Sequence, residues 1–171
     1  MRVAAAVLLT LVVCMSGSPA LAAAPVCHVR VDVTDNDPKG TNVRAAPDGH
    51  AKAVAVLKNT GDWIEVAIVG QSGDWFEIAS AVQIDNNAPA DKTIFSGHGF
   101  LHKSVVGLSG LQQGTTIYAD HDVKSRVLVA SAAGDQTTQF LGCWGDFYKV
   151  HVQNITGWTK EVCTNMNTTC A

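Results

Sequence analysis

A six-residue motif of this chain occurs twice in similar form, and that internal repeat constrains the fold more than any other feature. The segment GDWFEI at 73–78 returns as GDFYKV at 145–150. Upstream, TNVR at 41–44 is echoed more weakly by TTIY at 115–118. Segments that recur in the same order indicate a repeated structural unit. The sequence therefore predicts two copies of one small unit.

A closing segment and a linker give the limits of the two copies. GFLHK at 99–103 is echoed by GWTKE at 157–161. A stretch rich in Ser, Gly and Gln near 108–113 separates the copies. We expect a first domain at 27–108 and a second at 113–171, each near the lower size limit for an independent core.

Hydrophobic periodicity indicates strands almost throughout. Val29, Val31 and Val33 alternate with polar residues, which is the period of a half-buried strand. By the same alternation, Val43 and Ile117 are expected inside the two units. Gly, Asp, Asn or Pro separates most of the short apolar runs, and helical periodicity is missing from the sequence. The expected fold class is all-β, made of many short strands.

Three of these segments resemble motifs of the bacterial SH3 domain family (SH3b). GTNVRAAP at 40–47 is similar to the family's opening element, GDWFEI at 73–78 to its GDWYKV strand, and GW at 157–158 to its closing strand. The second copy departs from the pattern, because residues 117–122 hold only a degenerate opening element. The resemblance implies two tandem SH3-like small β-barrels. It also implies a module that binds cell-wall peptides or targets an enzyme, although fold predicts function weakly.

The N-terminus has the three-part pattern of a signal peptide. Arg2 precedes an apolar run at 3–15, and ALA at 20–22 supplies small residues for cleavage. The run is too short for a bilayer span, which needs about 20 residues. We expect residues 1–22 to be removed, leaving a periplasmic or secreted chain without membrane insertion. The alternative is a lipoprotein signal ending at Cys14, although the residue before it is valine.

Four cysteines remain after this leader, and an even number in an exported chain predicts two disulfides. They are Cys27, Cys143, Cys163 and Cys170. A hairpin turning at 153–154 would bring Cys143 close to Cys163, so we expect that pair, with Cys27 bonded to Cys170. The rival pairing joins Cys163 to Cys170 and Cys27 to Cys143.

Charge and motif content disfavour several functional classes. A formal charge of −3, from 12 basic and 15 acidic residues, offers no basic face for nucleic acid. No CxxC pair suits zinc, and His98 and His102 fit either a two-histidine metal site or, as we expect, a surface pair. A nucleophile with its base is not recognisable. We therefore expect a non-enzymatic protein that needs no metal or cofactor.

Aromatic side chains are the first candidates for ligand binding. Trp75 and Trp158 occupy motif positions and are expected in the core. Trp63, Trp144 and Tyr118 are better placed for an exposed groove, because indole and phenol combine apolar area with a polar group.

The arginine of the first copy is the remaining candidate. The Arg44 guanidinium could bind a ligand carboxylate through two hydrogen bonds, or it could form an ion pair with Asp48 or Asp74. The predicted ligand-binding set is Arg44, Trp63, Tyr118 and Trp144.

These expectations favour a non-enzymatic binding module of the cell envelope that recognises peptidoglycan peptides or another envelope component. The alternative is a protein–protein module, such as an inhibitor, immunity factor or assembly factor of an envelope enzyme, because no catalytic domain accompanies the repeats. A small cell-wall hydrolase is a third hypothesis, disfavoured because each mature cysteine has a potential disulfide partner.

Overall fold

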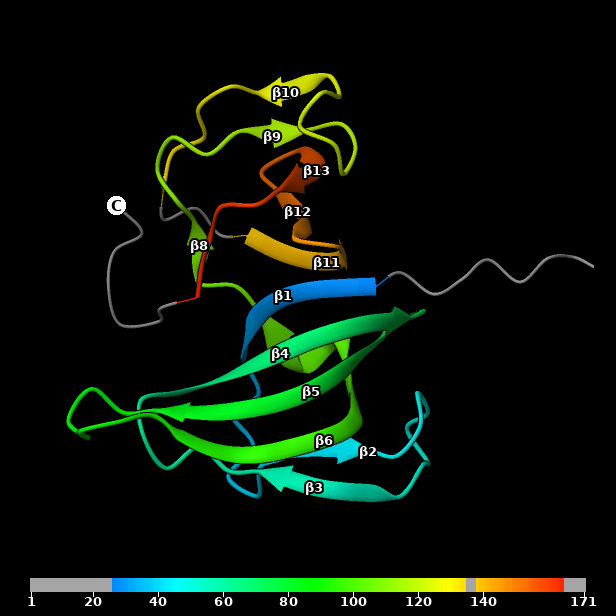
Figure 1. The fold of residues 1–171 in the computed structure, drawn as a ribbon, viewed down its shortest axis with the longest axis vertical. Coiled ribbons are helices and arrows are strands. Elements are labelled where there is room, and N and C mark those ends of the chain that lie inside the picture. The colour runs from blue at the N-terminus through cyan, green and yellow to red at the C-terminus, as the bar shows by residue number, and fades with distance from the viewer. Residues whose placement is uncertain (1–25, 135–137, 165–171) are drawn as a thin grey trace, which may run out of the picture.

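The computed structural model describes residues 26–134 and 138–164, which form two β-rich units (Figure 1). The expected signal peptide and Cys170 lie outside these residues. Within the described ranges, no helix is both long and apolar enough to span a membrane. The same ranges are all-β apart from the short 3-10 helix η1 (Lys103–Val105), which confirms the expected fold class.

The first unit contains strands β1 to β7 and the second contains β8 to β14. The strands of the first unit are β1 (Val26–Val33), β2 (Thr41–Arg44), β3 (Ala53–Leu57), β4 (Trp63–Ser72), β5 (Trp75–Ile84), β6 (Lys92–His102) and β7 (Val106–Gly107). The strands of the second unit are β8 (Gly110–Leu111), β9 (Ile117–Tyr118), β10 (Val127–Val129), β11 (Thr138–Trp144), β12 (Phe147–Val152), β13 (Ile155–Thr159) and β14 (Val162–Cys163).

The first unit is one antiparallel sheet in the order β3-β2-β6-β5-β4-β1-β7, and it curls into a half-barrel (Figure 1). The second unit has a five-stranded sheet in the order β10-β9-β13-β12-β11 and a separate pair, β14-β8. In the first unit, Phe76, Ile78 and Leu101 are completely buried by the curl. Each such side chain contributes about 1.5 to 3 kcal/mol when it leaves water.

The repeat seen in the sequence is also a repeat of structure. The order β3-β2-β6-β5-β4 in the first unit corresponds strand by strand to β10-β9-β13-β12-β11 in the second. Gly73 and Gly145 begin the repeated hexapeptides, and both have positive φ, 58° and 52°. Glycine adopts this conformation without the steric cost that a Cβ would bring. The two hairpin turns are therefore equivalent.

Gly99 and Gly157 occupy equivalent positions in the two units, and in each unit the opening strand passes close to this glycine. A Cβ on Gly99 would overlap Val43, and a Cβ on Gly157 would overlap Ile117. Val43 and Ile117 are both fully buried, which confirms their predicted interior positions. Each closing strand can therefore approach the opening strand of its own unit only because glycine stands there.

The loop after each opening strand is closed in the same way. In the first unit the Ala45 amide donates a 2.9 Å hydrogen bond to the Lys52 carbonyl. In the second unit the Ala119 amide donates a 2.8 Å hydrogen bond to the Arg126 carbonyl. The second copy thus keeps the loop although its opening sequence is degenerate.

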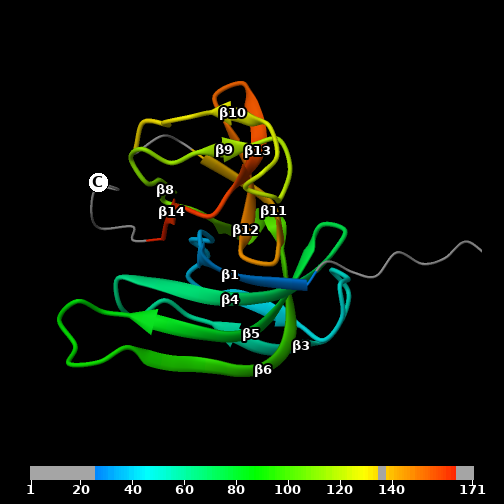
Figure 2. The same ribbon diagram turned by 45° about the horizontal axis from the view of Figure 1, so that its top comes forward.

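Strand β1 lies between the two units and contacts both (Figure 2). It pairs with β4 of the first unit along its length. At its beginning, Gly145 of the second unit donates to the Val26 carbonyl and accepts from the His28 amide, both at 2.7 Å. A disulfide joins Cys27 to Cys143 at the same place. This strand therefore holds the two units together.

The Cys27–Cys143 bond belongs to the rival pairing, so the favoured expectation, Cys143 with Cys163 and Cys27 with Cys170, is wrong. The hairpin behind that prediction does form between β12 and β13. The chain reverses once more at Gly145, however, which places Cys143 on β11, on the other side of β12 from β13. The bond therefore links the two units instead of closing a loop within the second.

The hydrophobic core is shared across the same border. Phe76 of β5 stacks on Phe140 of β11, with ring centroids 4.8 Å apart. Tyr148 of β12 meets Phe140 edge-on at 6.1 Å. Both phenylalanines belong to one continuous cluster of buried residues. The two units are therefore parts of one folded body.

A buried carboxyl group lies at this border as well. Asp32 of β1 is fully buried, and its Oδ2 accepts a 2.9 Å hydrogen bond from the Ser109 hydroxyl. Its Oδ1 is buried without a hydrogen-bond partner. Burial, opposed by the Ser109 hydrogen bond and assisted by the nearby Glu65 charge, raises the pKa of Asp32 from 3.8 to about 7.

Candidate functional site

A group of aromatic and basic side chains lies on the second unit at its border with the first. It consists of His121, Trp144, Lys149 and Trp158, and we call it the aromatic cleft. Trp144 ends β11, Lys149 lies on β12 and Trp158 lies on β13, while His121 belongs to the loop between β9 and β10. Three adjacent strands and one loop therefore contribute to one surface.

The side chains of the aromatic cleft are held by contacts with one another. The His121 ring centroid lies 4.7 Å from that of Trp144 and 5.2 Å from that of Trp158. His121 Nδ1 lies 2.6 Å from Asp120 Oδ1 without forming a hydrogen bond, so the ring contacts with the two indoles hold the imidazole. Lys149 Nζ lies 5.6 Å from the Trp158 ring centroid, within the range of a cation–π contact.

Trp144 remains 46% exposed in spite of these contacts. An indole is one of the largest apolar side chains, and leaving it in water forgoes stabilisation that burial would give. Exposed aromatic side chains that are fixed by neighbours are typical of binding surfaces. Trp144 is therefore the residue at which we expect a ligand to stack.

The first unit supplies the other wall of the aromatic cleft. Gln71, near the end of β4, accepts a 3.3 Å hydrogen bond from the Cys143 amide. A Cβ on Gly142 would lie 2.6 Å from Gln71 Oε1, so glycine at this position makes the approach possible. The hollow between Gln71, Trp144, Lys149 and Trp158 has a volume of about 330 Å³. That volume lies at the lower end of ordinary ligand sites.

The first unit does not repeat this surface. The positions that correspond in the repeat to Lys149 and Trp158 carry Glu77 and Phe100. There, Glu77 Oε1 lies 2.8 Å from His98 Nε2, so a carboxylate–histidine pair replaces the lysine over an indole. The lysine over an indole is therefore a feature of the second copy and has no counterpart at the equivalent positions of the first.

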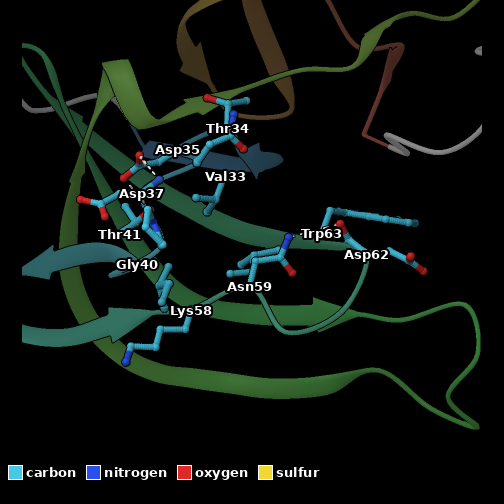
Figure 3. A pocket seen from close by; sticks show the side chains of 14 residues that line it. Val33, Thr34, Asp35, Asp37, Gly40, Thr41, Lys58, Asn59, Asp62 and Trp63 are labelled. Atoms are coloured by element: carbon cyan, nitrogen blue, oxygen red, sulfur yellow. Dashed lines mark hydrogen bonds between the residues drawn. The ribbon is translucent and has the colours of Figure 1, made fainter.

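A second hollow, of about 300 Å³, lies in the first unit between the loop after β1 and the loop before β4 (Figure 3). Asp35, Asp37, Lys58 and Asp62 give it a polar wall. The aspartate carboxylates already accept hydrogen bonds from nearby residues. Asp35 accepts one from the Thr41 hydroxyl at 3.0 Å, and Asp37 accepts one from the Lys39 amide at 2.8 Å.

Asp62 is engaged in the same way, since its Oδ2 accepts from the Asn86 amide at 2.8 Å. Aspartates that bond to nearby amides typically stabilise turns. These aspartates therefore bond the loops around the polar hollow, whereas Trp63 Nε1, buried in its lining, has no hydrogen-bond partner among the described residues. The exposure of Trp144 is not explained by packing.

The structure does not bring the four predicted ligand-binding residues together. Trp144 lies in the aromatic cleft, and Trp63 lines the polar hollow of the other unit. Trp63 is only 7% exposed, so the expectation of an exposed indole is wrong there. Tyr118 is half-buried, with its ring edge-on to Phe147 at 6.4 Å.

Arg44 has a structural contact. Its Nη1 donates a 2.8 Å hydrogen bond to the Ala51 carbonyl, which holds the loop between β2 and β3. The ion pair considered with Asp48 or Asp74 is not formed, because Asp74 pairs instead with Lys103 at 2.8 Å and Asp48 accepts from the His50 amide.

Sequence reasoning missed three members of the aromatic cleft. Trp158 was assigned to the core, but it is half-buried. His121 and Lys149 were not selected at all. The available signal was the difference between the copies, since an unmatched aromatic or basic residue at an equivalent position marks a surface that the fold itself does not require.

The remaining chemical candidates have local explanations. His98 pairs with Glu77, while His102 packs edge-on to Trp75 at 5.1 Å. Among the described residues, no group of three or more His, Cys, Asp or Glu side chains is arranged to hold a metal ion. Cys27, Cys143 and Cys163 are disulfide-bonded, so none of them offers a thiolate.

Comparisons of this chain with protein families, with curated proteins and with solved structures found no match. Function is therefore inferred from the geometry of the chain's own residues.

Proposed function

We propose that this protein is an exported, non-enzymatic binding module of the cell envelope, built from two tandem SH3-like barrels, and that its ligand binds in the aromatic cleft. The observation that carries the proposal is the 46% exposed Trp144, fixed by His121 beside Lys149. The similarity of residues 40–47 and 73–78 to SH3b motifs supports a module of this class.

The chemistry of the aromatic cleft suits peptidoglycan. The flat face of an indole stacks on the C–H face of a sugar ring or on an aliphatic side chain. The Lys149 ammonium can bind a carboxylate, which a stem peptide carries at its end and on its acidic residues. Peptidoglycan combines these sugar and carboxylate groups in one polymer, so we take it as the first ligand to test.

The second candidate ligand is a protein, such as an envelope enzyme for which this module would act as an inhibitor, an immunity factor or an assembly factor. The exposed indole of Trp144 favours this candidate, because tryptophan is enriched at protein interfaces and among the residues that carry most of their binding energy.

Sedimentation with purified, insoluble peptidoglycan tests the proposal. The protein is expected in the pellet, and Trp144→Ala is expected to weaken binding about tenfold or more, as for a central aromatic anchor. Lys149→Glu introduces the residue found at the equivalent position of the first unit, Glu77. This variant is expected to weaken binding more at low salt than at high salt, because salt screens the charge.

Lys92→Glu is the matched control, because Lys92 is an exposed β6 lysine outside the aromatic cleft. This variant should bind like the unchanged protein. Equal binding by Trp144→Ala would refute the site. The second candidate would be favoured by two results together. The protein would stay in the supernatant with peptidoglycan, and the immobilised protein, but not its Trp144→Ala variant, would retain an envelope protein.

A further inference from the structure

Strand β3 is the free edge of the half-barrel. It pairs with β2 on one side, and it stands first in the strand order of the seven-stranded sheet. No described strand lies beyond it, and Figure 1 shows it as the outermost strand of the first unit. Amide and carbonyl groups along such an edge are available to another strand.

The composition of β3 makes this edge unusual. Its sequence is AVAVL, and no charged or proline residue interrupts it. Val54 and Val56 are 48% and 47% exposed. Proteins protect an edge strand by keeping it short, by placing lysine or proline on it, or by a bulge. β3 has a register shift opposite Val43 and Arg44 and a lysine at each side, but its centre exposes two valines, which is where another strand could pair.

Two lysines flank the apolar segment. Exposure alternates along residues 52–58, so Lys52, Val54, Val56 and Lys58 are the exposed residues of this stretch. Within the described ranges, neither lysine forms an ion pair. Asp48 lies in the loop before Lys52, but its carboxylate accepts from the His50 amide. The edge thus presents two valines between two positive charges.

A second copy of this chain is a poor occupant. Antiparallel self-pairing that places Val54 opposite Val56 also places Lys52 opposite Lys58 of the other copy. Like charges directly opposite each other on neighbouring strands are destabilising. A shift by one residue would place exposed side chains opposite half-buried ones, and a shift by two would place Lys52 opposite Val56 or Lys58 opposite Val54 in place of a second valine pair. A partner segment with carboxylates at those positions therefore matches the lysines better than a second copy does.

We propose that the β3 edge binds an extended segment of a partner protein by strand addition, with β-branched residues in the middle of that segment and carboxylates at both ends. The main chain of the segment would extend the half-barrel by one strand. Its apolar side chains would cover Val54 and Val56, which lie on one face of the strand. Its carboxylates would meet Lys52 and Lys58. This surface is separate from the aromatic cleft.

A charge-exchange experiment tests the pairing. The probes are two synthetic peptides, Glu-Thr-Val-Thr-Val-Thr-Glu and the same peptide with lysine at both ends. The unchanged protein is expected to bind the glutamate peptide about tenfold more tightly, and Lys52→Glu/Lys58→Glu is expected to reverse that preference. The same preference for both proteins, or no preference, would overturn the proposal.

Valine substitutions locate the binding. Val56→Thr is expected to weaken binding of the glutamate peptide severalfold. The matched control is Val127→Thr, because Val127 is also 47% exposed and lies on β10, the edge of the other sheet. An equal loss in both variants would count against β3. Sedimentation equilibrium should show a monomer, and a dimer abolished by Val56→Thr would overturn the choice of partner.

Discussion

The two units share five corresponding strands, yet they differ in how far the sheet continues. In the first unit, β4 is followed by β1 and β7, so the sheet reaches seven strands. In the second unit the sheet ends at β11, and the strands that correspond to β1 and β7 form the separate pair β8–β14. The two copies of the unit thus form one more complete sheet and one shorter sheet that borders its neighbour.

This dependence is visible at β11. Cys143 of that strand is bonded to Cys27, and its Phe140 stacks on Phe76 of the first unit. The long strands β4, β5 and β6 of the first unit make most of their contacts with one another. Because the second sheet ends at β11, this strand borders the first unit directly. The aromatic cleft lies at that border and is lined by residues of both units.

Removal of the inter-unit disulfide gives the largest expected effect. Cys27→Ser/Cys143→Ser should lower the free energy of unfolding by about 4 to 5 kcal/mol, because the bond joins residues 116 positions apart and its loss frees the unfolded chain. Native-state hydrogen exchange should show the amides of β11 to β13 losing more protection than those of β4 to β6.

Trp144→Ala is a control at the neighbouring position, since an exposed residue should change stability little. Equal loss of protection in both sheets would contradict the idea that the second unit depends more on the first. Such a result would make the two units one cooperative body.

The buried carboxyl group of Asp32 is a second difference between the two units. Asp32 lies opposite Gly107, and the equivalent pair in the second unit is Gly110 with Cys163, so the second copy has no such acid. Because the pKa of Asp32 is raised to about 7, the folded protein holds this proton more tightly than the unfolded chain. Stability therefore falls as the pH rises from about 4 to about 7.

The expected contribution of this group between pH 5 and pH 8 is a loss of about 2 to 3 kcal/mol. Asp32→Asn should remove the slope, since the amide oxygen can still accept the Ser109 hydrogen bond without carrying charge. Urea unfolding at both pH values measures the difference. Asp146→Asn is the control, because that carboxyl group is exposed. A slope that survives in Asp32→Asn would assign the pH dependence to other groups.

The fold class was accessible from the sequence because its signals are local. Alternation at 29–31 and the glycines of the hairpin turns act within a few residues, and both are found where predicted, although Asp32 is buried where the alternation predicts an exposed side chain. The disulfide was not accessible, because it depends on which side of β12 the strand β11 occupies. That choice is made by tertiary packing of Phe140 on Phe76, which no local pattern records.

The candidate site was accessible only in part for the same reason. Trp144 could be selected as an exposed aromatic residue, since it follows no motif position. Trp63 could not be rejected, because its burial depends on segments distant in sequence. Likewise, His121 joins Trp144 and Trp158 only when the loop after β9 folds over β11 and β13.

The smallest expected effect concerns the last residue of the two opening strands, Arg44 in the first unit and Tyr118 in the second. Arg44→Met should lower stability by about 1 to 2 kcal/mol, because the Ala51 carbonyl loses a hydrogen bond from a charged donor. Thermal unfolding measures this loss, and Tyr118→Phe is the counterpart in the second unit, where the ring contact with Phe147 is kept.

Peptidoglycan binding should stay unchanged in both variants, because neither residue lines the aromatic cleft. Arg44→Met that keeps its stability but loses binding would instead place the ligand on the first unit, and the division of roles between the two copies would have to be reversed.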